Sequence, residues 1–183
     1  MNNWNRIEEF YNSVYENGLP KIVLCGINPG RNGAGKTGIL FLDFTSLSKI
    51  MNGVNRSDSE RSAQFFYDIV EEIGVGTFYN SFYVTNISWV GYTKGGKNLN
   101  CYDLPPLVKR FVLDMFKYEM AVVSPTTIIP LSSRVQDTLK GLFDDVTIDT
   151  NLKLPDPNYC AFPKNYESCK AMYLEVLSKY IKT

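Results

Sequence analysis

One short stretch, residues 21–41 (KIVLCGINPGRNGAGKTGILF), carries two patterns that predict different chemistry. Read from Gly30, it matches G-x-x-x-x-G-K-[ST], ending at Thr37, in which backbone amides and a lysine hold the phosphates of a nucleotide. Read from Gly26, it gives Gly-Ile-Asn-Pro-Gly straight after an apolar strand, with the side-chain amide of Asn28 at its centre. The two patterns overlap, so they cannot both be functional.

The phosphate-loop interpretation fits the surrounding sequence poorly. A functional phosphate loop starts where the strand ends and passes directly into a helix after the Lys-[ST] pair. Here the strand ends near Cys25, well before Gly30, and Gly38 follows the Lys-Thr pair. The best candidate for a strand with a magnesium-binding aspartate, residues 146–149, is short and late in the chain. A P-loop nucleotide enzyme therefore stays only a remote alternative.

The amino-acid composition limits the chemistry that the site can use. The 183 residues include no histidine, which excludes Ser-His-Asp and Cys-His nucleophile systems and histidine metal sites. Four cysteines, at positions 25, 101, 160 and 169, form no C-x-x-C pair, which argues against zinc ribbons and redox dithiols. We therefore expect no metal and no cofactor.

The charge balance also restricts the partners. With 19 basic and 19 acidic residues, the chain has no global attraction to nucleic acid, so any contact with DNA must be local. The first residues do not resemble a secretory signal, and no apolar run reaches membrane-spanning length. We expect a cytoplasmic monomer that does not enter a membrane.

Hydrophobic periodicity and turn residues predict alternating helices and strands. The expected helices cover residues 4–15, 63–73, 107–118, 133–143 and 166–180, the strands cover 22–25, 81–88, 126–131 and 146–148, and exposed or Pro-rich loops cover 91–98 and 155–163. This order predicts an α/β fold: a three-layer single domain over residues 1–183 with a central, mostly parallel four-stranded sheet flanked by helices.

Some local signals mark where these elements begin and end. Ser57 and Glu60 form a possible capping box before the second helix, and Gly74 stands where its C-terminal cap belongs. Asp103 can open the third helix, and Ser133 can cap the fourth.

Ligands of parallel α/β sheets bind beyond the carboxyl ends of the strands. The loops that begin at Gly26, Ser88, Ser132 and Thr150 should therefore meet at one cleft.

Several segments resemble one enzyme family in both order and placement. Gly26–Gly30, followed by Thr37–Phe41, resembles the first motif of the single-strand-selective monofunctional and mismatch-specific branches of the uracil-DNA glycosylase superfamily. Phe82–Ser88 resembles the segment whose asparagine reads the edge of uracil, and Pro130–Val135 also has a counterpart. The resemblance extends from about Lys21 onward and looks closest to the bacterial branch similar to single-strand-selective glycosylases.

The resemblance implies a monofunctional DNA glycosylase that acts on a flipped pyrimidine in DNA. It assigns Asn28 to positioning the attacking water and Asn86 to reading the base, with Phe41, Gly26 and Ile27 lining the base pocket. Each residue also has an ordinary structural interpretation. The first asparagine can cap a turn, the second can be a satisfied strand-end residue, and the phenylalanine can be part of the core.

The last motif departs from the family pattern. Relatives of this type carry a histidine that hydrogen-bonds the departing base, whereas this chain has Asp156 within Leu154–Tyr159. The carboxyl can be protonated in a desolvated pocket, or face the cationic sugar, or accept from an amino group on the base. The third option suggests a modified cytosine, such as those of some phages, as substrate. A plain turn residue, or a weakened enzyme that only binds nucleic acid, stays open.

Phosphate contacts should come from basic residues in loops on the cleft side. The candidates are Arg31, Lys36, Lys94, Lys97, Lys153 and Lys164.

Overall fold

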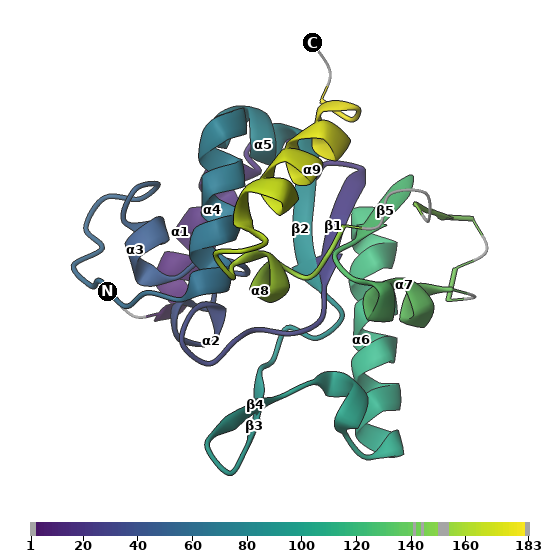
Figure 1. The fold of residues 1–183 in the computed structure, drawn as a ribbon. Coiled ribbons are helices and arrows are strands. Elements are labelled where there is room, and N and C mark those ends of the chain that lie inside the picture. The colour runs from purple at the N-terminus through teal and green to yellow at the C-terminus, as the bar shows by residue number, and fades with distance from the viewer. Residues whose placement is uncertain (1–2, 141, 144, 150–153, 182–183) are drawn as a thin grey trace.

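Four parallel strands form the centre of the molecule (Figure 1). The strands are β1 (Ile22–Gly26), β2 (Phe82–Asn86), β5 (Thr127–Pro130) and β6 (Thr147–Ile148), in the spatial order β2-β1-β5-β6. All three pairings are parallel. The computed structural model describes residues 3–140, 142–143, 145–149 and 154–181. The predicted α/β fold class and parallel sheet are confirmed.

The register of the sheet decides which strand-end residues become neighbours. β1 lies between β2 and β5, so both of its edges are paired and its side chains from Val23 to Cys25 are fully buried. This explains the continuous apolar run, which is typical of a central parallel strand. At the carboxyl end, Gly26 stands directly beside Asn86 of β2.

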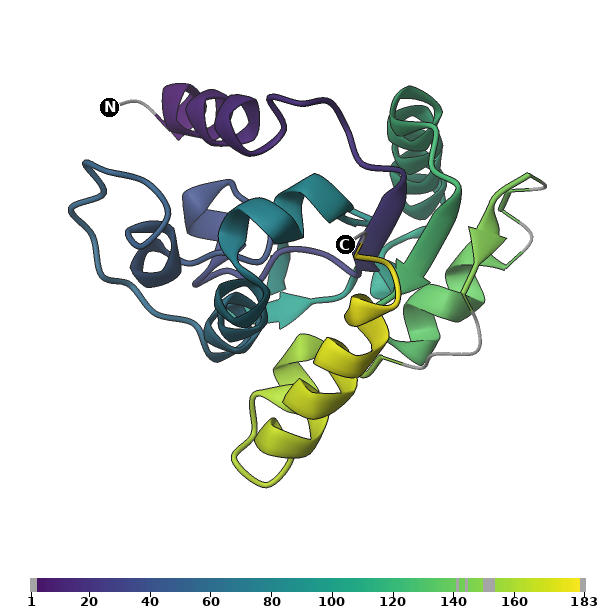
Figure 2. The ribbon, with the colours of Figure 1, turned by 90° about the horizontal axis from the view of Figure 1, so that it is seen from above.

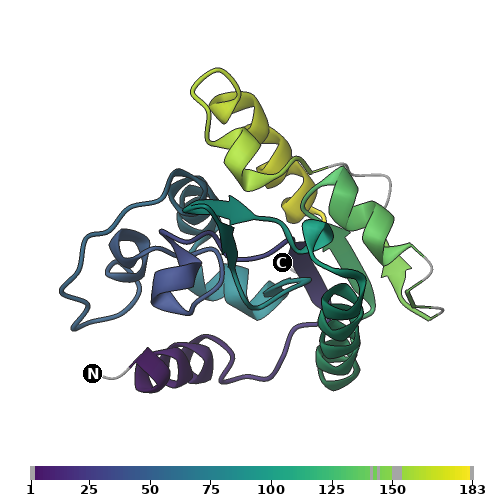
Figure 3. The ribbon, with the colours of Figure 1, turned by 90° about the horizontal axis from the view of Figure 1, so that it is seen from below.

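Helices cover both faces of the sheet (Figures 2 and 3). One side carries α1 (Asn3–Val14) and α6 (Pro106–Val123), and the other carries α4 (Arg61–Ile73), α7 (Ser133–Leu139), α8 (Pro157–Cys160) and α9 (Tyr166–Ser178). The remaining elements are α2 (Ala34–Thr37), α3 (Phe44–Leu47), α5 (Val75–Ser81), the hairpin of β3 (Tyr92–Lys94) and β4 (Lys97–Leu99), and the 3-10 turn η1 (Cys101–Asp103).

Aromatic side chains fill much of the core between the sheet and the α4 layer. Phe66 and Phe78 are fully buried and meet edge to face, with 5.7 Å between their ring centroids. Phe65 packs in the same way on Tyr173 of α9, at 5.4 Å. Such aromatic pairs add to the stabilisation that burial of their large surface supplies. This packing holds α4 and α9 in place beside the sheet.

The start of α4 is not the capping box that the sequence suggests. Glu60 is the N-cap residue, but its side chain makes no capping bond, and Ser57 plays no part. The cap comes instead from Asp43, whose Oδ2 accepts from the Glu60 N–H at 2.7 Å, while its Oδ1 accepts from the Ser46 N–H at 2.7 Å. The Gln64 amide is a further donor. One fully buried carboxylate therefore joins the starts of α3 and α4.

Other boundaries also differ from the prediction. Ser132, not Ser133, caps α7 by accepting from the N–H of Val135, and the helix ends at Leu139. Pro105 is the N-cap of α6, and Asp103 belongs to the preceding 3-10 turn. The predicted C-cap role of Gly74 is confirmed, with a φ of 91°.

The two predicted loops contain short elements. Residues 91–98 include most of the β3-β4 hairpin, whose turn uses Gly95 and Gly96 at positive φ. The Pro-rich segment contains α8. Within the described part of the chain, no helix has the length and apolar character needed to cross a membrane.

Candidate active site

A cavity of about 510 Å³ opens at the carboxyl end of the sheet. Its wall includes all six residues that the sequence assigns to catalysis or base binding: Gly26, Ile27, Asn28, Phe41, Asn86 and Asp156. They come from the end of β1 and the turn after it, the segment between α2 and α3, the end of β2 and the N-cap of α8. The structure therefore brings the predicted site residues together. The cavity that they surround is large enough for a base of pyrimidine size.

Gly26 forms a part of the wall that has no room for a side chain. A Cβ atom there would lie 2.4 Å from Asn86 Oδ1 and 2.4 Å from Phe41 Cζ, both closer than real Cβ contacts. The glycine therefore lets the amide and the ring approach the same point. This close approach, rather than an unusual backbone angle, is the reason for glycine here.

The amide of Asn86 faces the cavity from a buried position. The residue is 3% exposed, and no hydrogen bond to its side chain occurs among the described residues. An amide of this kind offers one acceptor and two donors. Its bonding capacity is available to a ligand in the cavity.

The amide of Asn28 is oriented by the segment that follows the hairpin. Its Oδ1 accepts from the N–H of Cys101 at 3.0 Å, and its Nδ2 donates to the carbonyl oxygens of Leu99 and Pro29, each at 3.4 Å. The carbonyl oxygen of an amide can accept two hydrogen bonds, so Oδ1 keeps one acceptor site. The end of β4 and the start of η1 thus fix the direction in which Asn28 presents that site.

Phe41 is both packed and strained. Its ring stacks on Phe66, with 4.5 Å between centroids and 27° between planes, yet the residue also lines the cavity. Its φ of 60° lies in the left-handed region that non-glycine residues rarely adopt. Such a conformation costs on the order of 1–3 kcal/mol and occurs often at functional sites. With this backbone conformation, Phe41 Cζ lies beside Gly26.

Asp156 is a helix cap and a cavity residue at once. Its Oδ1 accepts from the N–H of Asn158 at 2.8 Å, as the N-cap of α8. Burial raises the pKa of its carboxyl, and hydrogen bonds from the Asn158 and Tyr159 amides oppose this only in part. Asp156 therefore has a structural role as a helix cap, and the same residue also lines the cavity.

Glu60 is a cavity residue that the sequence did not suggest for the site. Its carboxylate lies in the turn of Gly30 and Gly33, where a Cβ on either glycine would fall within about 2 Å of an oxygen. Burial raises the pKa of this carboxyl, and the nearby Asp43 raises it further, whereas a hydrogen bond from the Gly33 amide lowers it. The only sequence signal at this position was the apparent capping box.

These contacts also leave no room for a phosphate in the loop that matches the phosphate-binding pattern. The turn in which a phosphate would lie is filled by the Glu60 carboxylate, and the Lys36 ammonium pairs with Asp58 at 3.2 Å. The short α2 ends at Gly38 immediately after the Lys-Thr pair. The geometry does not support nucleotide binding by this loop.

Comparison with known protein families matches residues 14–177 to the "Uracil DNA glycosylase superfamily". The chain belongs to this superfamily. Among solved structures, the crystal structure of wild-type Pedobacter heparinus SMUG2 has the same fold, with a TM-score of 0.78 and 22% sequence identity. The alignment covers 96% of this chain and 82% of that one. No curated protein matches the sequence.

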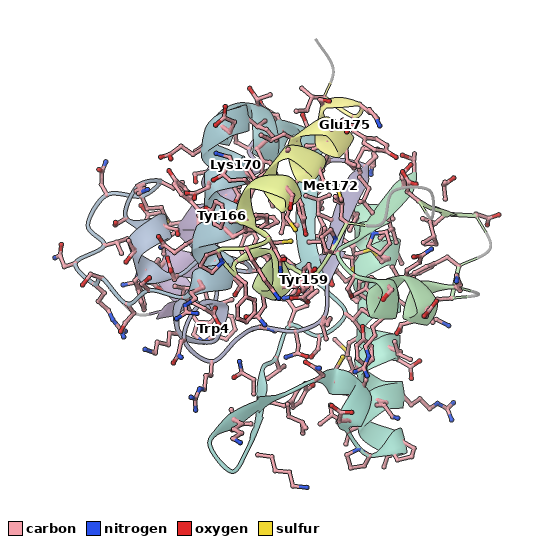
Figure 4. The ribbon with its side chains drawn as sticks, viewed as in Figure 1. Trp4, Tyr159, Tyr166, Lys170, Met172 and Glu175 are labelled. Atoms are coloured by element: carbon pink, nitrogen blue, oxygen red, sulfur yellow. The ribbon has the colours of Figure 1, made fainter. Side chains whose placement is uncertain are left out.

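Further wall residues of this glycosylase-superfamily cavity were missing from the sequence prediction. Asn98 and Asn100 come from the hairpin strand β4 and the residue after it, and Tyr159 and Phe162 come from α8 and the turn that follows. Figure 4 shows Tyr159 at the end of the α8–α9 pair that faces the hairpin. Isolated asparagines and aromatics in loops carry no periodicity, so the sequence could not select them. The loop after β5, expected at the cleft, contributes no described residue to the wall.

The predicted phosphate-binding residues do not all gather at one place. Arg31, Lys94 and Lys97 are exposed around the β3-β4 hairpin, and the N–H of Arg31 donates to Asn98 Oδ1 at 3.3 Å. Lys164 is exposed in the turn between α8 and α9. Lys36 is paired, as described above, and Lys153 lies outside the described residues.

No metal-binding cluster and no reactive thiol occur at the described part of this cavity. Groups of three His, Cys, Asp or Glu residues able to hold a metal are absent among the described residues. Cys101, beside Asn28, is buried, and burial raises its pKa to about 11. Its thiol is therefore neutral near pH 7 and is not an activated nucleophile.

Proposed function

We propose that this protein is a monofunctional DNA glycosylase that hydrolyses the N-glycosidic bond of uracil or a related pyrimidine in DNA. The observation that carries the proposal is the convergence of Asn28, Phe41 and Asn86 on one base-sized cavity around Gly26. Membership of the uracil-DNA glycosylase superfamily supports the same reaction class.

The reaction breaks the bond between C1′ of the deoxyribose and N1 of the base. The electron pair of that bond leaves with the base, and C1′ becomes cation-like. A water oxygen then bonds to C1′ and its proton passes to the departing base anion, which leaves an abasic sugar and a neutral free base. The site must therefore hold a flipped base, position a water and tolerate charge on both fragments.

Asn86 is suited to reading the base. Its carbonyl can accept from N3–H of uracil while its NH₂ donates to O4, and one amide cannot satisfy both atoms of a cytosine in the same orientation. Because the side chain is buried and unpaired among the described residues, a base without matching groups would leave a desolvated amide unsatisfied. This cost lets the site discriminate between uracil and bases without matching groups.

Phe41 and Asn28 then complete the site. Stacking of a base on an aromatic ring contributes on the order of 1–3 kcal/mol. The remaining acceptor site of Asn28 Oδ1, fixed by Cys101, is suited to hold the attacking water.

The charge of the Asp156 carboxyl affects how easily the base can leave. A carboxylate about 4 Å from the departing uracil anion, at an effective dielectric near 20, would raise the barrier by about 4 kcal/mol. That corresponds to roughly a thousandfold in rate. Partial burial raises the pKa of this carboxyl, which extends the pH range of the neutral acid, the form that can donate a hydrogen bond to the departing base.

A second candidate substrate is a modified cytosine, and the charge of the cavity favours it. Two carboxyl groups, those of Asp156 and Glu60, line the cavity, while none of its described lining residues is a lysine or arginine. An exocyclic amine would give the ionised carboxylates a donor. Under this proposal the acidic wall selects a base with an amino group.

One assay tests these proposals together. Oligonucleotides carrying uracil, hydroxymethyluracil, mismatched thymine or modified cytosines are incubated with the protein, with and without chelator, and abasic sites are then cleaved with alkali. Strand breaks that persist with chelator are the expected result. Tight binding to these oligonucleotides with no abasic sites would instead select a non-catalytic binder and overturn the proposal.

A further inference from the structure

Helix α6 has two apolar faces where a surface helix needs only one. Its inner face packs on the sheet through Val112, Phe116, Met120 and Val123, all buried. A second set of apolar residues is exposed, with between 38% and 81% of each side chain accessible. This set, called the outer seam here, consists of Leu107, Val108, Phe111, Met115, Tyr118 and Val122.

The outer seam is continuous along the helix. At 100° per residue, its six positions fall within an arc of about 100°, the width of an apolar stripe that normally faces a core. From Val108 to Val122 the spacing is three, four, three and four residues, the pattern with which one helix packs against another. Figures 2 and 3 look nearly along α6 and show it at the outer edge of the molecule.

We propose that the outer seam is the interface of a homodimer, in which α6 packs antiparallel against α6 of a second copy. The seam is nearly symmetric about Met115, with Val108 seven residues before it and Val122 seven after, and with Phe111 and Tyr118 on either side. A two-fold axis through Met115 therefore places Phe111 opposite Tyr118 of the other copy, as an isologous interface requires. Antiparallel packing also opposes the two helix dipoles.

The size of the outer seam fits a dimer. With roughly 150–250 Å² for a large side chain and the exposed fractions of the six residues, the seam offers roughly 550–900 Å² per copy, a range that includes the ~800 Å² per partner of a standard interface. Patches of this size are unusual on a monomer. The six seam residues carry no charge for a DNA phosphate, and the basic residues of α6, Lys109, Arg110 and Lys117, line a separate pocket. It also differs from the cavity, whose wall contains no α6 residue.

Sedimentation velocity over a concentration series tests the proposal. The wild-type protein is expected to sediment at twice the monomer mass and to dissociate on dilution. Phe111→Glu with Tyr118→Glu should sediment as a monomer at every concentration, with an unchanged circular dichroism spectrum. The matched control is Met172→Glu, an exposed methionine on α9 (Figure 4), which should remain a dimer. A monomeric wild type, or a double variant that still dimerises, overturns the proposal.

Cross-linking tests the antiparallel arrangement. The four native cysteines are buried, so an introduced surface cysteine reports on the seam alone. A mixture of Val108→Cys and Val122→Cys proteins should form a disulfide-linked heterodimer under mild oxidation, whereas neither variant alone should cross-link. Cross-linking of each variant with itself would show parallel helices and overturn this geometry. Vesicle binding by a monomeric wild type would assign the seam to a lipid surface instead and overturn the dimer.

Discussion

Asn28 and Asn86 occupy similar positions at two neighbouring strand ends but are held in different ways. The Asn28 amide is fixed by backbone groups of Leu99 and Cys101, whereas the Asn86 side chain makes no hydrogen bond among the described residues and opens on the cavity. A fixed amide suits a water that must be held in one place, and an unpaired amide suits a base that arrives with its own donors and acceptors. This difference supports the separate roles proposed for them.

Replacement of Asn28 by alanine should reduce excision strongly. Loss of the water-holding carbonyl is expected to lower kcat by roughly 10²–10⁴-fold with little change in KM, because binding of the base does not use this side chain. Single-turnover kinetics on the best substrate measure the effect. Asn32→Ala is the control, since Asn32 is exposed in the same loop outside the cavity. An equal loss in both variants would contradict the assigned role.

Gly26→Ala should block the site without disturbing the surface. The added methyl would collide with Asn86 Oδ1 and Phe41 Cζ, so one or both must move, and a shift of about 1 Å can cost about 100-fold in rate. Excision kinetics and thermal unfolding are measured together. Gly76→Ala in α5, where nothing lies within 4 Å of the new carbon, should leave excision unchanged. Normal excision by the Gly26 variant would remove the glycine from the site.

The pH dependence of uracil excision should report on Asp156. Burial raises the pKa of its carboxyl, so the neutral form persists to a higher pH than in an ordinary aspartate. If that form donates to the departing base, the rate should fall as pH rises through the raised pKa. Asp156→Asn, neutral at every pH, should lose this falling limb. A rate that instead rises through the same range would show that the carboxylate is the active form, as expected for an amino-bearing base.

Among the elements, the segments that hold the site are joined by a buried and a partly buried carboxylate rather than by regular secondary structure. Asp43 links the starts of α3 and α4, and Glu60 of the α4 N-cap reaches into the Gly30–Gly33 turn. The β1 loop is thereby tied to α4 on one side and, through Asn28, to the end of the hairpin on the other. The turn after β1 is therefore held both by Glu60 and by the contacts of Asn28 at the end of the hairpin.

Asp43→Ala should destabilise the fold. Its removal leaves the amides of Ser46 and Glu60 without their acceptor in a buried place, at about 1–3 kcal/mol for each unpaired donor. Denaturant unfolding measures the free energy. Asp137→Ala is the control, because Asp137 is exposed and pairs only with Lys140, so about 0–1 kcal/mol is expected. Similar losses in the two variants would show that the buried link is not important.

At the scale of the whole molecule, the balanced charge requires DNA attraction to come from a small group of cations. Arg31, Lys94 and Lys97 are gathered around the hairpin at the cavity end of the sheet. This hairpin therefore has two tasks in the proposed function. It supplies positive charge for phosphates, and it orients Asn28.

Lys94→Ala with Lys97→Ala should weaken DNA binding and reduce its dependence on salt. Each lost phosphate contact should lower the slope of log K against log salt by about 0.9 on duplex DNA and about 0.7 on a single strand. Binding titrations over a salt series measure both slopes. Lys179→Ala, after α9, is the control and should leave the slope unchanged. A slope that does not change in the double variant would exclude the hairpin lysines as phosphate contacts.

Apolar runs and their order along the chain predict the sheet and the convergence of the main site residues. An apolar run without alternation predicts a central parallel strand, and parallel strands bring their carboxyl ends to one edge. Asn28 and Asn86, each at or just after such an end, were therefore predictable neighbours, and the Gly-Ile-Asn-Pro-Gly turn resembled a family motif that the comparisons support.

The remaining features of the site were not predictable from local sequence patterns. The insertion of Glu60 into the glycine turn, the hold of the hairpin on Asn28 and the double role of Asp156 depend on contacts between distant segments. The outward position of Phe111 in α6 is also a matter of packing, because an apolar residue at helical spacing is equally compatible with either face. Periodicity records which residues share a face, whereas the side of the helix that meets the sheet is set by the packing of the whole chain.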